Sequence, residues 1–188
     1  MHLLLSLFFL VPPLNLNWEK EYKNKYIQLE NYQYHSGNMQ SNPLVYVGKS
    51  LFLNMESELQ LFFFQKKIYK AILIFGPKGI DHENCIKKFR DHVALLTKKY
   101  GTPAFQKTET SFLESELIYA SQCHLYSIGM KKRTVSWKTK KFNIKTFLVG
   151  DDEGFYIETF YLHRDAAKPN LRKNKKDIYK RISKEIRK

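Results

Sequence analysis

The fold of this 188-residue chain is decided by residues 80–103, which read IDHENCIKKFRDHVALLTKKYGTP. Apolar residues recur there at alternating spacings of three and four, which places them on one face of a helix. They are Ile86, Phe89, Val93, Leu96 and Tyr100. Asp81 is a favourable N-cap, and Gly101 and Pro103 are typical of positions just beyond a helix end. We therefore predict a helix over 81–100 whose apolar face packs on the rest of the domain.

Segments with strand character lie on both sides of this helix. Residues 44–53, 59–65 and 68–75 precede it, and residues 134–142, 144–149 and 155–162 follow it. Val135, Trp137 and Thr139 alternate with polar residues, which is typical of a half-buried antiparallel strand. These patterns predict an α+β fold, namely a mainly antiparallel sheet of about six strands with one or two helices packed on one face.

The chain divides into four parts. Residues 1–16 form an apolar leader, 17–43 an N-terminal helix and loop, 44–163 the α+β domain, and 164–188 a basic helical tail. The apolar run 3–11 has the length of the central part of a signal peptide, although no cleavage site of small residues follows it. It indicates export, and the alternative is an N-terminal segment that packs on the domain.

Positive charge is concentrated in the tail. The chain carries a formal net charge of +14, and residues 164–188 hold 11 basic and 3 acidic residues, which leaves +8 there. Such a segment is attracted to phosphates or to an anionic surface. Its candidate anion-binding residues are Arg172, Lys173, Lys175, Lys176, Lys180, Arg181, Lys184 and Arg187. The alternative is a solvated helical tail without a partner.

The two cysteines, Cys85 and Cys123, face each other if 111–127 is a second helix that turns back antiparallel to the first at 103–104. A disulfide between them would contribute about 3–4 kcal/mol under the chain-entropy model. Two free, buried cysteines are the alternative. The same pairing brings His82 and His124 near, but adjacent Cys123 and His124 diverge by about 100° on a helix, which argues against a zinc site.

The sequence motifs typical of phosphate-binding, catalytic and calcium-binding sites are incomplete or absent. Gly48-Lys49-Ser50 resembles the end of a phosphate-binding loop, but the glycine required five residues earlier is replaced by Pro43. No GxSxG sequence is present. The acidic triplet 151–153 lacks the spacing of a calcium loop and is typical of a solvated hairpin tip. We therefore assign no catalytic, cofactor-binding or metal-binding residue.

Several of these features together resemble a type of small, uncharacterised exported bacterial α+β protein. They are the strand 68–75, the helix with Phe89, Val93 and Leu96, its ending KYGTP at 99–103, and the strand that contains Trp137. The resemblance covers residues 44–162. It implies a location in the periplasm or cell envelope, and it carries over no site residue.

Three functional hypotheses follow, from different classes. The first is a non-enzymatic exported protein of the cell envelope that binds another macromolecule, either an envelope protein or an anionic surface. The second is a cytoplasmic nucleic-acid-binding module that uses the basic tail, with affinity that falls steeply with salt. The third is an unrecognised hydrolase, which would need a pocket with convergent polar groups. No cofactor is expected for any of the three.

Overall fold

The computed structural model describes residues 14, 16–23, 27–39, 42–50, 55–80, 84–110, 122–127, 131–151 and 154–166. Within them the elements run in the order β1 (Tyr32–Asn38), β2 (Asn42–Ser50), β3 (Met55–Phe64), β4 (Lys67–Ile80), α1 (Cys85–Tyr100), β5 (Phe105–Thr110), α2 (Gln122–Ser127), β6 (Lys131–Lys138), β7 (Phe142–Asp151) and β8 (Gly154–His163).

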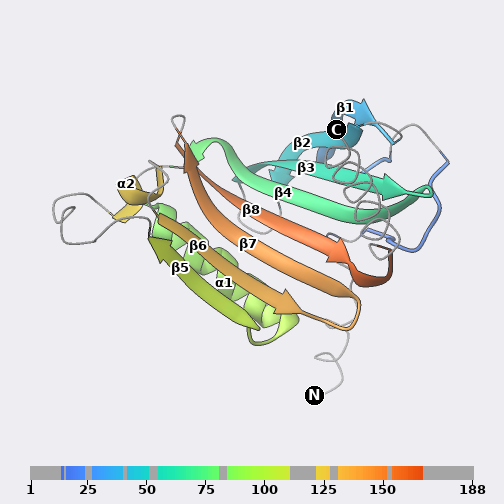
Figure 1. Cartoon of the computed structure of the whole chain (residues 1–188). Coiled ribbons are helices and arrows are strands. Elements are labelled where there is room, and N and C mark those ends of the chain that lie inside the picture. Colours follow the sequence, from blue (N-terminus) through green and yellow to red (C-terminus); the bar gives the residue numbers. More distant parts are fainter. Residues whose placement is uncertain are drawn as a thin grey trace, which may run out of the picture.

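All eight strands belong to one antiparallel sheet with the order β1-β2-β3-β4-β8-β7-β6-β5 (Figure 1). The four strands before α1 join the four after it through pairing of β4 with β8, from Lys70 opposite Leu162 to Ile80 opposite Phe155. The prediction that segments on both sides of the helix share a sheet is therefore confirmed.

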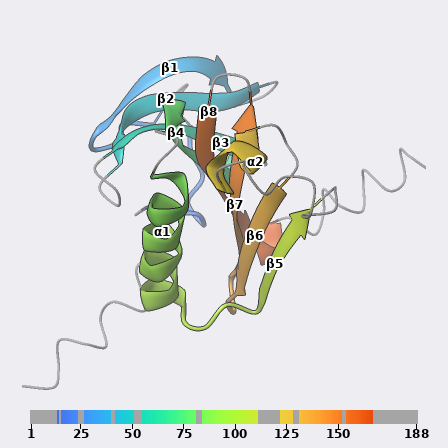
Figure 2. The same ribbon diagram turned by 90° about the vertical axis from the view of Figure 1, so that its left-hand side faces the viewer.

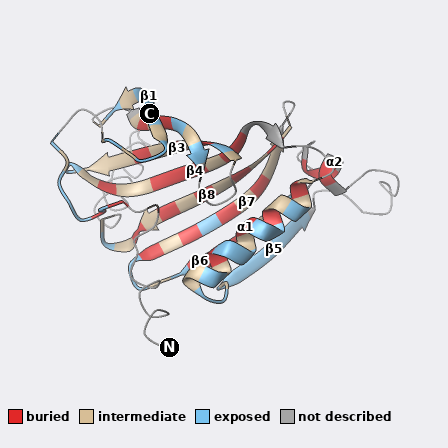
Figure 3. Cartoon of the chain, turned by 180° about the vertical axis from the view of Figure 1, so that it is seen from behind, coloured by how far each residue is buried: buried red, intermediate tan, exposed pale blue. Residues whose placement is uncertain are grey.

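The register places the buried strand residues on one face, which we call the inner face. Leu59 of β3 pairs with Leu73 of β4, and Leu73 pairs with Thr159 of β8. All three side chains are buried. Figure 3 shows buried positions alternating with less buried ones along β8, as expected for a strand with one covered face. Helix α1 covers part of this inner face.

Helix α1 packs through the predicted stripe and ends where predicted. Phe89 and Leu96 are almost fully buried. Gly101 has φ 83° and its N–H donates to the Thr97 carbonyl at 2.9 Å, as a residue just beyond a helix end does. The indole N–H of Trp137 donates to the Gly101 carbonyl at 3.0 Å, which fastens the end of α1 to β6. Asn84 precedes the helix, and Asp81 lies outside the described residues.

The predicted fold class was wrong. Within the described residues the protein is mostly sheet, with eight strands and not six, and its two named helices are α1 of 16 residues and α2 of 6, so α+β is not the correct description. The two missed strands, β1 and β5, are the two edges of the sheet. Every residue from Phe105 to Glu109 is exposed, so β5 carries no burial pattern for a sequence to show.

The predicted helix in 17–43 is also wrong. Residues 17–23 and 27–31 form turns and irregular segments without a helix, and Tyr32–Asn38 is β1. Trp18 packs edge-on against Phe142 with ring centroids 5.0 Å apart, and Tyr22 donates its backbone N–H to the Lys66 carbonyl at 2.9 Å. The aromatic residues of this segment therefore bind it to the domain without a helix.

The structure contains the Cys85–Cys123 disulfide, with Cα atoms 6.1 Å apart. The helical hairpin that predicted it is wrong, because a strand, β5, occupies 105–110 between the two helical segments. Only 122–127 of the predicted second helix is helical within the described residues, and 111–121 lies outside them. The bond joins α2 to the first residue of α1.

Candidate functional site: a groove beside helix α1

A groove of about 460 Å³ lies beside α1. Six of its lining residues come from the helix, and the seventh is Arg133 of β6. The helical residues are Phe89, Arg90, Val93, Ala94, Thr97 and Lys98. Their spacing repeats every four residues, so they form the side of α1 next to its buried face. In Figure 2 this helix stands on one side, and β6 and β5 stand on the other.

The inner face of β6 supplies the opposite wall. Arg133 pairs with Leu148 of β7, a fully buried inner-face residue, so Arg133 points to the same side of the sheet. Its guanidinium lies 5.7 Å from the centroid of the Phe89 ring. Such a cation–π contact fixes an arginine head group beside the apolar floor that Phe89 and Val93 provide.

The charges around the groove have one sign. Arg90, Lys98 and Arg133 line it, and no Asp or Glu does so among the described residues. The other lining side chains are apolar except for the Thr97 hydroxyl. An arrangement of three cations around an apolar floor can bind a negatively charged group that also carries apolar surface. Among its described lining residues there is no Asp, Glu, His or Cys, the residues that most often serve as general bases or nucleophiles.

Next to the groove, the core contains a buried polar network. His92 on α1 shares a hydrogen bond of 2.7 Å with the Thr159 hydroxyl, which in turn lies 3.0 Å from the Thr146 hydroxyl. Burial lowers the pKa of His92 to about 3, so the imidazole is neutral at pH 7. His92 lies within the buried face of α1. Its burial makes it a structural residue.

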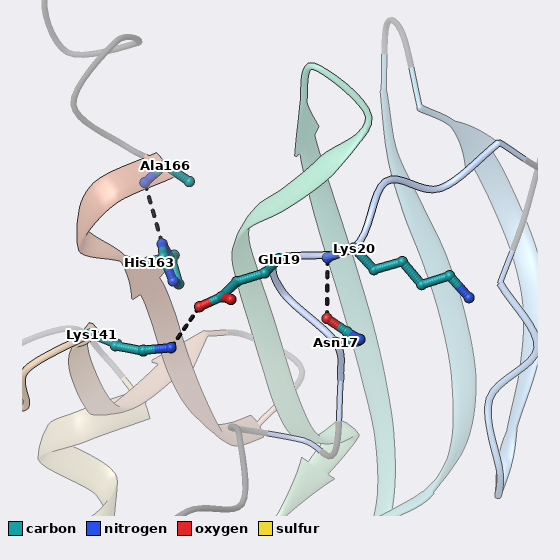
Figure 4. A network of polar contacts seen from close by, with 6 residues as sticks. All are labelled: Asn17, Glu19, Lys20, Lys141, His163 and Ala166. Atoms are coloured by element: carbon teal, nitrogen blue, oxygen red, sulfur yellow. Dashed lines mark hydrogen bonds and ion pairs between the residues drawn. The ribbon is translucent and has the colours of Figure 1, made fainter.

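A second histidine, His163, lies at the end of β8 against the N-terminal segment (Figure 4). Its ring stacks on Trp18 at 6.4 Å, and its Nδ1 accepts the backbone N–H of Ala166 at 3.3 Å. Burial lowers the pKa of His163. Beside it, Lys141 donates to Glu19 at 2.6 Å, and this contact lowers the pKa of the Glu19 carboxyl. The cluster binds the N-terminal segment to the sheet.

The groove does not include any residue singled out from the sequence as a site. The eight basic tail residues, Arg172 to Arg187, lie outside the described part of the chain, as do His82, Asp152 and Glu153. No group of three or more metal-binding side chains occurs within the residues that the structure describes. A search for a second stripe beside the apolar one on α1 would have found Arg90 and Lys98, but not Arg133.

Comparisons with protein-family models, with curated proteins and with solved structures found no match for this chain. None of the helices in the described ranges has the length and apolar character needed to cross a bilayer.

Proposed function

We propose that this protein is a binding protein that holds a negatively charged macromolecule in the groove between α1 and β6. The observation that carries the proposal is the clustering of Arg90, Lys98 and Arg133 around an apolar floor. Cations at the rim would steer an acidic partner, and contact with Val93 and Ala94 would select partners with apolar side chains beside their charges.

The proposed location is an oxidising compartment outside the cytoplasm. The Cys85–Cys123 disulfide supports it, since such bonds persist in exported proteins and are rare where thiols are kept reduced. The apolar run at 3–11 agrees with this location. The resemblance to exported bacterial proteins remains a prediction.

The experiment measures the affinity of the full-length, disulfide-bonded protein for two fluorescein-labelled probes. One is an octapeptide of alternating Val and Glu, and the other is a single-stranded oligonucleotide. The groove variant carries Arg90→Gln, Lys98→Gln and Arg133→Gln. A matched control removes the same charge elsewhere, by Lys87→Gln, Lys138→Gln and Lys145→Gln, all at exposed positions.

We expect the groove variant to lose at least tenfold in affinity for the peptide, while the control loses less than threefold. Equal losses would mean that binding follows overall charge, and the proposal would be wrong. A full-length variant with Gln at the eight basic tail residues tests the alternative function, which is nucleic-acid binding by the tail. If the oligonucleotide binds more tightly than the peptide and only the tail variant loses it, the protein is a nucleic-acid-binding module.

A further inference from the structure

Strand β5 is one edge of the sheet that the described strands form. It pairs with β6 in unbroken register, from Phe105 opposite Ser136 to Thr110 opposite Lys131, and its other side pairs with no described strand. The opposite edge, β1, has two register shifts, one on each side of Ser36. Such bulges twist an edge strand and discourage further pairing, and β5 has none of them.

The side chains of β5 leave its inner side uncharged. Lys107 and Glu109 pair with the outer-face positions of β6 and form an ion pair with each other at 3.0 Å. Gln106 and Thr108 pair with Val135 and Arg133, which places them at inner-face positions. Proteins often protect an edge with an inward-pointing charge or a proline, and β5 contains neither.

The β5 edge and the groove lie side by side. Thr108 is directly opposite Arg133, which lines the groove. A strand added to β5 would run about 4.8 Å from it, and every second side chain of that strand would point toward the inner side of the sheet. These inward side chains would approach the wall of α1 that carries Arg90 and Lys98.

We infer that the partner is an extended, acidic segment of another protein, which adds to β5 as a ninth strand and directs its acidic side chains toward the groove. The inference rests on the proposed function of the groove and names its partner class. Backbone hydrogen bonds to β5 supply affinity in this mode of recognition, and the groove selects the side chains. Because the charged residues that line the groove, Arg90, Lys98 and Arg133, are all positive, they favour an acidic segment.

The test compares three octapeptides on the full-length protein. The first alternates Val and Glu, the second has the same sequence with N-methylated central amides, and the third has Lys in place of Glu. N-methylation removes backbone donors and blocks strand pairing while it keeps the charge and the apolar side chains. Amide hydrogen exchange of the isotope-labelled protein reports which strand the peptide protects.

We expect the first peptide to bind at least tenfold more tightly than either of the others and to slow exchange in Phe105–Thr110 at least tenfold, with no change in β1. If the N-methylated peptide binds equally well and β5 is not protected, strand addition is wrong, whereas groove-dependent binding still supports the proposed function. If neither acidic peptide binds, both proposals are wrong.

Discussion

The imidazole of His92 and the hydroxyl of Thr159 form a hydrogen bond of 2.7 Å across the interface between α1 and β8. Both side chains are buried, and His92 also contacts the edge of the Phe75 ring with centroids 4.8 Å apart. The bond joins the helix to the centre of the sheet, where the two halves of the chain meet. A proton on this histidine would place a charge in the core.

The stability of the protein should therefore fall in mild acid because of His92. Its pKa is about 3 in the folded state and about 6.5 in an unfolded chain, so the unfolded state binds the proton first as pH falls below 6.5. Proton uptake by the unfolded state therefore lowers the free energy of unfolding by about 1.4 kcal/mol for each pH unit between pH 6 and pH 4. In the His92→Gln variant the measured slope should be smaller by this contribution, while the part due to other groups such as His163 remains. Chemical denaturation at pH 7, 5 and 4 measures it, and equal slopes in both proteins would contradict the assignment.

The disulfide should stabilise the fold through the 38 residues that separate its cysteines. Replacing both residues, as Cys85→Ala with Cys123→Ala, should lower the free energy of unfolding by about 3–4 kcal/mol. Urea denaturation of the variant and of the wild type, without reductant, provides the measurement. Mass spectrometry after alkylation of protein taken from its native cell gives a second check. Two alkylated cysteines there would count against an oxidising location.

Two glycines should respond differently to alanine. At Gly101 the backbone has φ 83° and ψ −168°, a region almost confined to glycine, and an added Cβ meets no atom within 4 Å, so Gly101→Ala should cost only the backbone strain of about 1–3 kcal/mol. At Gly48 a Cβ would lie 2.0 Å from the Asn31 carbonyl oxygen, which is backbone and would have to move. Thermal unfolding should show a markedly larger loss of stability for Gly48→Ala than for Gly101→Ala. A smaller loss at Gly48 would contradict the close approach of β2 to the segment before β1.

The attachment of the N-terminal segment to the sheet should depend more on the packing of Trp18 than on the ion pair between Glu19 and Lys141. Trp18 is 4% exposed and packs on Phe142 and His163, so Trp18→Ala should cost about 3–5 kcal/mol. The pair of Glu19 with Lys141 is exposed, so Glu19→Gln should leave the unfolding midpoint nearly unchanged. Denaturant midpoints of the two variants compare the contributions directly. A larger effect of Glu19→Gln than of Trp18→Ala would mean that charge, not packing, binds this segment.

The sequence predicts the part of the fold that is buried. Six strands and α1 were located because their apolar residues alternate or recur with the helical period, as in Val135 and Trp137 or in Phe89 and Leu96. Strands β1 and β5 were missed because edge strands need no such pattern, and exposed Phe105 looks no different from a loop residue. The error in fold class follows from these two strands.

The candidate site was harder to predict than the fold. Arg90 and Lys98 are ordinary solvated residues in a helical pattern, and only the strand pairing of Arg133 places a third cation beside them. The cysteine bond was anticipated from an incorrect hairpin, since α1 and α2 meet through the sheet topology and not through a tight turn. Groups that meet through long-range pairing leave no local pattern in a sequence.

The most direct test of the account locates the bound acidic peptide on the protein. A nitroxide at the centre of the Val-Glu octapeptide broadens the amide signals of nearby residues in the isotope-labelled, full-length protein. The account predicts broadening in Phe105–Thr110, around Arg133 and along the side of α1 from Arg90 to Lys98, and none in β1. Broadening centred on β1, or on outer-face positions such as Lys145 and Glu158, would contradict it.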